Sequence, residues 1–235
     1  LHLSIRRQRQ MCIRDSLMTS PAKYTILCDV DGVLADLATC LCDELTLRGM
    51  RLSPSDIRHY DFKLSMPPDV VAEAYDVMGD YGFCHSLFWY EGARKFVFDF
   101  VHGRYSSDFE MLLVTAPFPS ETWVQERKAW ATASGIRGCD VLSIPIEHKY
   151  RLRGDCLVED HPGTLYDWLE ANPNGHGVLV DRPWNQRTAA EFKFHNRAFR
   201  AKTHDEVAKY VNAFRATGRA SVDYRSIDES PEVAA

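Results

Sequence analysis

Apolar runs of strand length alternate with helical patterns along most of this chain, and this alternation restricts the fold more than any other feature. We expect strands over residues 24–28, 110–115, 140–144, 156–158 and 177–181. We expect helices over residues 35–48, 70–78, 93–101, 121–134, 162–170 and 205–216. Strands that alternate with helices are typical of an α/β protein with a doubly wound parallel sheet. In such sheets the active site lies beyond the carboxyl ends of the strands.

One interval departs from the alternation. No convincing strand lies in residues 36–91, although helix-entry signals occur at Ser53-Pro54 and Pro67-Pro68. We therefore expect a small helical cap over residues 36–91, inserted directly after the first strand. Residues 18–35 and 92–216 should form the α/β core, and 235 residues are enough for one core with such an insertion.

The two ends of the chain look different from the rest. Residues 6–16 resemble translated sequencing-adapter read-through, so we expect residues 1–17 to be extraneous and translation to start at Met18. A basic arm for an anionic partner is the alternative. The end of the chain is polar, small and acidic, which predicts a disordered tail over residues 217–235.

Charge argues against binding to a nucleic acid polymer or a membrane surface. Four arginines and one aspartate give residues 1–17 a net charge of +3, so the remaining residues carry −8 where the whole chain carries −5. No apolar run approaches the roughly 20 residues that a membrane span needs. Seven scattered cysteines without a C-x-x-C pair are typical of reduced thiols in a cytoplasmic protein.

The first strand leads into Asp29-Val30-Asp31-Gly32. Side chains two residues apart in a strand point the same way, so Asp29 and Asp31 should lie side by side at the mouth of the sheet. Gly32 can adopt the backbone geometry that turns the chain sharply away. Two carboxylates this close favour a hard cation such as Mg²⁺ between them. Taken alone, the motif is also compatible with an acidic, solvated turn.

Other polar residues fall at or before strand ends that should converge on this loop. Thr115 ends a strand, where its hydroxyl suits a phosphate oxygen, and backbone N–H groups from Ala116 onward can add to it. Glu159 and Asp160 follow another strand and can complete the oxygen shell of a metal. Lys149 can neutralise a carboxylate or a bound phosphate. Each residue also has a simpler interpretation. Thr115 would be a strand-end hydroxyl, Glu159-Asp160 a solvated turn, and Lys149 a surface lysine.

These motifs, in this order, resemble the four motifs of the haloacid dehalogenase superfamily of phosphohydrolases. Within it the chain is most similar to the 5′(3′)-deoxyribonucleotidases, over about residues 23–214. The matching motifs are D-V-D-G-V-L-A-D at residues 29–36, Leu87 with Gly92-Ala93, Thr115-Ala116-Pro117, Lys149 with Glu159-Asp160, and V-D-R-P-W-N at residues 180–185.

The resemblance implies a two-step phosphoryl transfer. Asp29 would be the nucleophile that forms an aspartyl-phosphate, and Asp31 the general acid and base. The implied Mg²⁺ site consists of Asp29, the Asp31 backbone carbonyl and Asp160. The implied phosphate-binding groups are Thr115, Ala116 and Lys149. We expect Glu159 to lie behind the metal ligands, since adjacent residues at a strand end point apart.

The implied substrate is a deoxyribonucleoside monophosphate. Another small phosphomonoester such as a sugar phosphate is the alternative, as is a non-catalytic relative that binds a phosphorylated ligand. Leu37 stands where family members often carry an aromatic residue. Candidates for the substrate pocket are Leu37, Phe62, Phe88 and Trp89, although the aromatic residues are also compatible with hinge and core packing. A homodimer is compatible with the resemblance.

Overall fold

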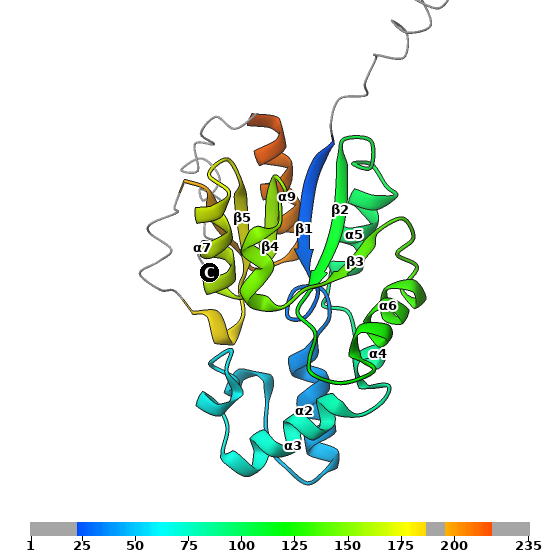
Figure 1. Ribbon diagram of the computed structural model, residues 1–235, viewed down its shortest axis with the longest axis vertical. Helices are drawn as coiled ribbons and strands as arrows, with labels where there is room; N and C mark the ends of the chain where they lie inside the picture. The colour runs from blue at the N-terminus through cyan, green and yellow to red at the C-terminus, as the bar shows by residue number, and fades with distance from the viewer. Residues whose placement is uncertain (1–22, 187–195, 218–235) are drawn as a thin grey trace, which may run out of the picture.

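The computed structural model describes residues 23–186 and 196–217 (Figure 1). The expectations for residues 1–17 and for the tail after residue 217 fall outside these residues. Within the described part, no helix is both long and apolar enough to span a membrane.

Six parallel strands form one sheet in the order β3-β2-β1-β4-β5-β6. The strands are β1 (Tyr24–Asp29), β2 (Phe109–Thr115), β3 (Asp140–Ser143), β4 (Cys156–Glu159), β5 (His176–Val180) and β6 (Ala198–Ala201). The expected doubly wound α/β class is therefore confirmed. The edge strand β6 is an addition, because no strand was expected there.

Helices cover both faces of the sheet (Figure 1). They are α5 (Ala93–Val101), α6 (Trp123–Ala133), α7 (Pro162–Ala171) and α9 (His204–Thr217). The apolar side of α7 packs with Leu27, Val114 and Leu157 on one face. The opposite face packs with α5 and α9 in the larger hydrophobic core. Strands buried on both faces explain why the apolar runs in the sequence are nearly continuous.

The segment between β1 and α5 is helical and lies beyond the carboxyl ends of the strands (Figure 1). Its elements are α2 (Leu37–Leu47), η1 (Pro54–Asp56), η2 (Phe62–Leu64), α3 (Pro68–Gly79) and α4 (Phe83–Ser86). Asp36 begins α2 by accepting a hydrogen bond from the backbone N–H of Thr39 at 3.0 Å. This segment is called the cap below.

The two connections between cap and core lie side by side. The backbone N–H of Asp36 donates to the Phe88 carbonyl at 2.8 Å, and that of Tyr90 donates to the Leu34 carbonyl at 2.9 Å. His204, at the start of α9, places its ring nitrogens 2.9 Å from the carbonyl oxygens of Val33 and Glu91. One core residue thus contacts both connections.

The order of the strands decides where side chains converge. The chain runs outward from β1 to β2 and β3 and then crosses back to β4, so β1 and β4 are neighbours at the point where the order reverses. Ligands of open α/β sheets bind at such a point. Residues that follow β1 and β4 therefore meet there, below the cap.

Candidate active site

Asp29 and Lys149 form a buried ion pair at the end of β1. Lys149 lies in the short helix η3 (Ile146–Arg151), and its Nζ is 2.9 Å from Asp29 Oδ1. The same ammonium donates to Glu159 Oε2 at 3.1 Å. Burial opposes a charge on Lys149, but its pKa is raised because the two carboxylates stand beside it.

Three buried carboxylates gather around this ammonium. Asp29, Glu159 and Asp160 each offer an oxygen, and these oxygens lie within 4.8 Å of one another. Burial raises the pKa of all three groups, that of Asp160 to about 6, and neighbouring carboxylates add to the effect. Three carboxylates and one ammonium leave two uncompensated negative charges when all are ionised, which a divalent cation would balance.

The contacts of Asp160 fit an oxygen ligand to a hard cation. Its Oδ2 accepts a hydrogen bond from Trp184 Nε1 at 2.7 Å, in the short helix η4 (Pro183–Asn185). Its Oδ1 is buried and has no hydrogen-bond partner among the described residues. An unsatisfied buried carboxylate oxygen is costly unless it meets a proton or a cation. The residues present therefore fit a cation such as Mg²⁺.

Asp31 is held at both carboxylate oxygens. Thr115, the last residue of β2, donates its hydroxyl to Asp31 Oδ2 at 3.1 Å. Arg127, in α6, donates Nη2 to Asp31 Oδ1. The side chain of Asp31 is 18% exposed and borders the pocket described next. The Asp31 carboxylate is not part of the group formed by Asp29, Glu159 and Asp160.

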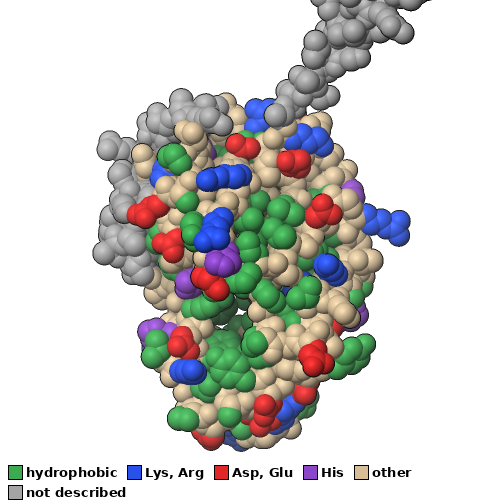
Figure 2. Space-filling model, viewed as in Figure 1, with side chains coloured by type: hydrophobic (Ala, Val, Ile, Leu, Met, Phe, Trp, Pro, Cys, Tyr) green, Lys and Arg blue, Asp and Glu red, His purple; other side chains and the backbone are tan. Residues whose placement is uncertain are grey.

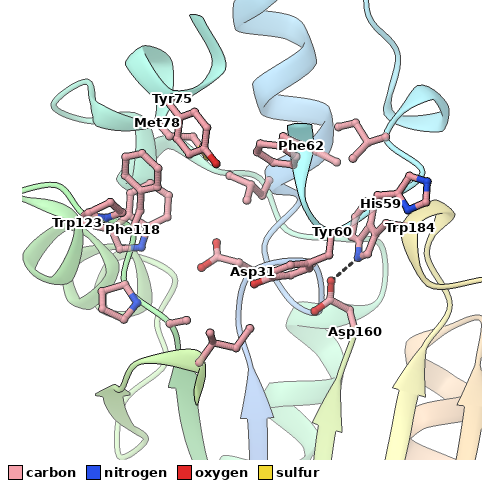
Figure 3. Close-up of a pocket in the computed structure, with 18 residues that line it drawn as sticks. Asp31, His59, Tyr60, Phe62, Tyr75, Met78, Phe118, Trp123, Asp160 and Trp184 are labelled. Atoms are coloured by element: carbon pink, nitrogen blue, oxygen red, sulfur yellow. Dashed lines mark hydrogen bonds between the residues drawn. The ribbon is translucent and has the colours of Figure 1, made fainter. Parts of the chain in front are cut away.

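A pocket of about 300 Å³ lies between cap and core, with Asp31 and Asp160 at one end (Figure 3). Figure 2 shows the surface hollowed between the two parts, with hydrophobic side chains around the hollow. Tyr60 lies beside both carboxylates in Figure 3, and its ring packs on that of His161 at 4.3 Å. The apolar walls come from Leu37, Ala38, Ile57, Phe62, Met78, Pro117, Phe118, Pro119, Trp123 and Ile146.

The sequence-predicted residues divide into those at the site and those away from it. Leu37, Phe62 and Ala116 line the pocket. Phe88 is 65% exposed and does not line it. Trp89 is also outside the pocket, because its ring stacks on Trp130 at 4.5 Å, and its Nε1 donates to Ser134 Oγ at 3.0 Å. The alternative of core packing describes Trp89 better, and Phe88 contributes its backbone carbonyl to the connection between cap and core.

Glu159 differs from the expectation that it would point away from Asp160. Both residues contribute oxygens to the same acidic group, and Glu159 also binds Lys149. The reason is that β4 ends at Glu159, so the alternation of a strand does not extend to the next residue. The backbone N–H of Asp160 donates a hydrogen bond to Glu159 Oε1 at 3.2 Å.

Sequence reasoning missed Arg127 and Tyr60, and it included Trp184 only as part of the V-D-R-P-W-N motif, without a role at the site. Arg127 carried a usable signal, since tryptophans four residues before it and three residues after it place it on an apolar helix face. Trp184 follows the end of β5 (His176–Val180) and so belongs to the converging edge. Tyr60 lies in an irregular part of the cap, where neither period nor motif indicates a role.

No family model and no curated protein sequence matches this chain. Solved structures do resemble it. A dehalogenase crystallised as an intermediate complex is 10% identical, with a TM-score of 0.50 over 80% of this chain and 96% of that one. A HAD family hydrolase from Deinococcus radiodurans R1, with bound phosphate and sodium, is 15% identical over 85% and 97% of the chains, at a TM-score of 0.48. The L-2-haloacid dehalogenase from Xanthobacter autotrophicus is 14% identical over 81% of this chain and 99% of that one, at a TM-score of 0.45. The sheet order and the first of these likenesses together show that this chain shares the α/β fold of that dehalogenase.

Proposed function

We propose that this chain is a phosphomonoester hydrolase in which Asp29 accepts the phosphoryl group. The observation that supports this most is the pairing of Asp29 with Lys149 at the end of β1, with Asp31 two residues further on and facing the pocket. A buried carboxylate beside a cation is placed to attack a phosphorus whose negative oxygens need compensation.

Two displacements at phosphorus account for the reaction. In the first, an Asp29 oxygen bonds to phosphorus as the bond to the ester oxygen breaks, and Asp31 gives its proton to the leaving alkoxide. In the second, water attacks the aspartyl-phosphate and gives a proton to Asp31, which releases phosphate and restores Asp29. Thr115 and Lys149 lie where they can donate to phosphate oxygens.

Asp29, Glu159 and Asp160 are the side chains that would hold a divalent cation, and Mg²⁺ suits their all-oxygen set. When bound, such an ion would offset negative charge between the nucleophile and the phosphate. The Asp31 backbone carbonyl is a further proposed ligand. Among the described residues, these three form the one acidic group with this spacing.

Deoxyribonucleoside monophosphates are the proposed substrates. The pocket offers flat apolar walls such as Phe62, Phe118 and Trp123 next to Asp31, which suits an uncharged ring on the leaving group. A sugar phosphate is the alternative, but its buried hydroxyls would need hydrogen-bond partners that apolar walls do not supply. The choice of a deoxynucleoside also rests on the similarity of residues 29–36 and 180–185 to that family.

The test is phosphate release in the presence of Mg²⁺ from p-nitrophenyl phosphate, deoxyribonucleotides, ribonucleotides and sugar phosphates. We expect kcat/KM to be highest for deoxyribonucleotides, because a pocket packed against C2′ leaves a buried hydroxyl unpaired. Asp29→Asn should abolish release, and Asp43→Asn, at an exposed position of α2, should not. Equal activity of the Asp29→Asn protein would refute the mechanism. Faster hydrolysis of sugar phosphates than of every nucleotide would refute only the substrate.

A dehalogenase of the same fold makes halide release the natural comparison. An ester-forming carboxylate serves both reactions, but a halide leaves without a proton, whereas an alkoxide needs one. Asp31 beside the pocket therefore favours the phosphomonoester. Chloride release from a 2-chloroacid that exceeds phosphate release from all phosphomonoesters would reverse this preference.

A further inference from the structure

Arg127 is buried in an unusual setting. Its side chain is fully buried, and its guanidinium lies 5.6 Å from the ring of Trp123 and 5.2 Å from that of Trp130. Its Nη2 donates to Asp31 Oδ1. The Nε and Nη1 groups have no hydrogen-bond partner among the described residues. The contact with Asp31 is therefore the one ion pair that the described residues offer this cation.

This arrangement is a poor way to stabilise a fold. A buried ion pair loses hydration that its Coulomb attraction seldom repays unless the remaining donors are also satisfied. Arg127 leaves two donor groups unsatisfied, and an apolar residue of similar size would fill the space between Trp123 and Trp130. The position of the guanidinium is better explained by what it does to Asp31.

We propose that Arg127 is a positioning residue for proton transfer by Asp31. Arg127 binds Oδ1 of Asp31 and Thr115 binds Oδ2, so the carboxyl group is held in one orientation at the border of the pocket. Arg127 does not line the pocket and therefore acts through Asp31 and not on the substrate. This inference rests on the proposed function, since it assigns Asp31 the role of proton donor to the leaving group.

A positioning role for Arg127 differs from a purely structural role in how the loss of activity depends on the leaving group. Replacing Arg127 should lower kcat/KM more for substrates whose leaving oxygen needs a proton than for substrates whose leaving oxygen does not. Benzyl phosphate leaves as an alkoxide and needs one, whereas p-nitrophenyl phosphate leaves as a stabilised phenolate and does not. Both carry one ring of similar size, so binding in the pocket changes little between them. The value of kcat/KM reports the first displacement, where this proton is used.

The experiment compares kcat/KM for benzyl, phenyl and p-nitrophenyl phosphate in the wild-type protein, Arg127→Met and Arg127→Lys. We expect Arg127→Met to lower kcat/KM about 100-fold for benzyl phosphate and less than about fivefold for p-nitrophenyl phosphate, as loss of general acid catalysis would. Phenyl phosphate should fall between them. Arg127→Lys, which keeps the cation, should recover part of the loss on benzyl phosphate. Lys128→Met, the exposed neighbour on α6, is the matched control and should change neither value.

A second background separates positioning from folding. The Asp31→Asn protein has no proton donor left to position. Adding Arg127→Met to it should therefore not change the ratio of kcat/KM for benzyl phosphate to kcat/KM for p-nitrophenyl phosphate. Equal losses on all three substrates, or an additive loss in the Asp31→Asn background, would overturn the proposal. Activity that survives Asp29→Asn would instead refute the proposed function, so the two failures are distinguishable.

Discussion

The carboxylate of Asp160 occupies the space that a side chain at position 32 would need. A Cβ built on Gly32 would lie 2.2 Å from Asp160 Oδ2 and 2.7 Å from its Cγ. Gly32 also has a φ of +79°, a conformation that other residues rarely adopt. The glycine after the two aspartates thus has two functions, since it turns the chain after β1 and leaves room for Asp160, the residue that follows β4.

Gly32→Ala should therefore abolish the proposed Mg²⁺-dependent phosphate release, because the added methyl group displaces Asp160. Gly49→Ala is the matched control, since its φ is +86° and nothing lies within 4 Å of the added Cβ. Both variants should lose about 1–2 kcal/mol of unfolding free energy from the left-handed conformation. Urea denaturation and phosphate release measure the two effects, and retained activity in Gly32→Ala would show that Asp160 is dispensable.

Metal binding should depend on pH through Asp160, whose pKa is raised to about 6 by burial and by Asp29. A carboxyl whose folded-state pKa exceeds its unfolded value stabilises the protein as pH falls, because the folded state then binds the proton more tightly. A proton competes with the cation for the same oxygens. The rise in Tm on adding MgCl₂ should thus be larger at pH 7.5 than at pH 5.5.

Asp160→Asn should remove that rise at both pH values. Asp167→Asn, at an exposed position of α7, should leave it as in the wild-type protein. A Tm increase that does not change between pH 7.5 and pH 5.5 would contradict the assignment of Asp160 as a ligand.

The convergence of the candidate site residues could be predicted because it depends only on which segments form the parallel strands. Parallel strands bring their carboxyl ends to one edge, so Asp29, Thr115 and Asp160 had to converge once the strands were recognised. The strand β6 was missed because Ala198–Ala201 is short and contains an arginine, which makes its apolar run indistinct. Its place at the sheet edge follows from pairing with β5, which no local pattern reveals.

Side-chain partners were harder to foresee than strand ends. Aromatic residues at the end of the cap suggested a pocket wall, but the structure places the ring of Trp89 on Trp130, forty-one positions along the chain. An arginine in a helix is usually solvated, and although the flanking tryptophans indicate that Arg127 is buried, its pairing with Asp31 is visible only in the tertiary structure. For both Trp89 and Arg127, packing between segments that are distant in the sequence determines where the side chain lies.

Lys149→Met should destabilise the protein more at neutral pH than at acidic pH. Removing the cation leaves Asp29 and Glu159 buried without a counter-charge, which typically costs about 3–5 kcal/mol. Burial already raises the pKa of both carboxyl groups in the folded state, so protonation relieves the repulsion as pH falls. Urea unfolding at pH 8 and pH 5 measures the difference, and an equal loss at both values would contradict the ion-pair explanation.

Cap and core together build one aromatic wall of the pocket. Tyr75 from α3 stacks on Phe118 from the loop after β2, with ring centroids 5.8 Å apart and planes 22° apart. Both rings line the pocket, so a substrate ring seated there would contact an aromatic surface fixed by the two parts at once.

Phe118→Ala should raise KM for a deoxyribonucleotide by a factor of about 2–12, the range that an aromatic contact of about 0.5–1.5 kcal/mol gives. It should leave kcat/KM for glycerol phosphate, which has no ring, within about twofold of the wild-type value. Tyr75→Ala in the Phe118→Ala background should add little, because the two rings stabilise each other. Tyr81→Ala, a cap tyrosine that is 87% exposed, is the control and should leave both substrates unaffected. If Phe118→Ala lowers kcat/KM equally for the nucleotide and for glycerol phosphate, the ring serves cap closure and does not recognise the leaving group.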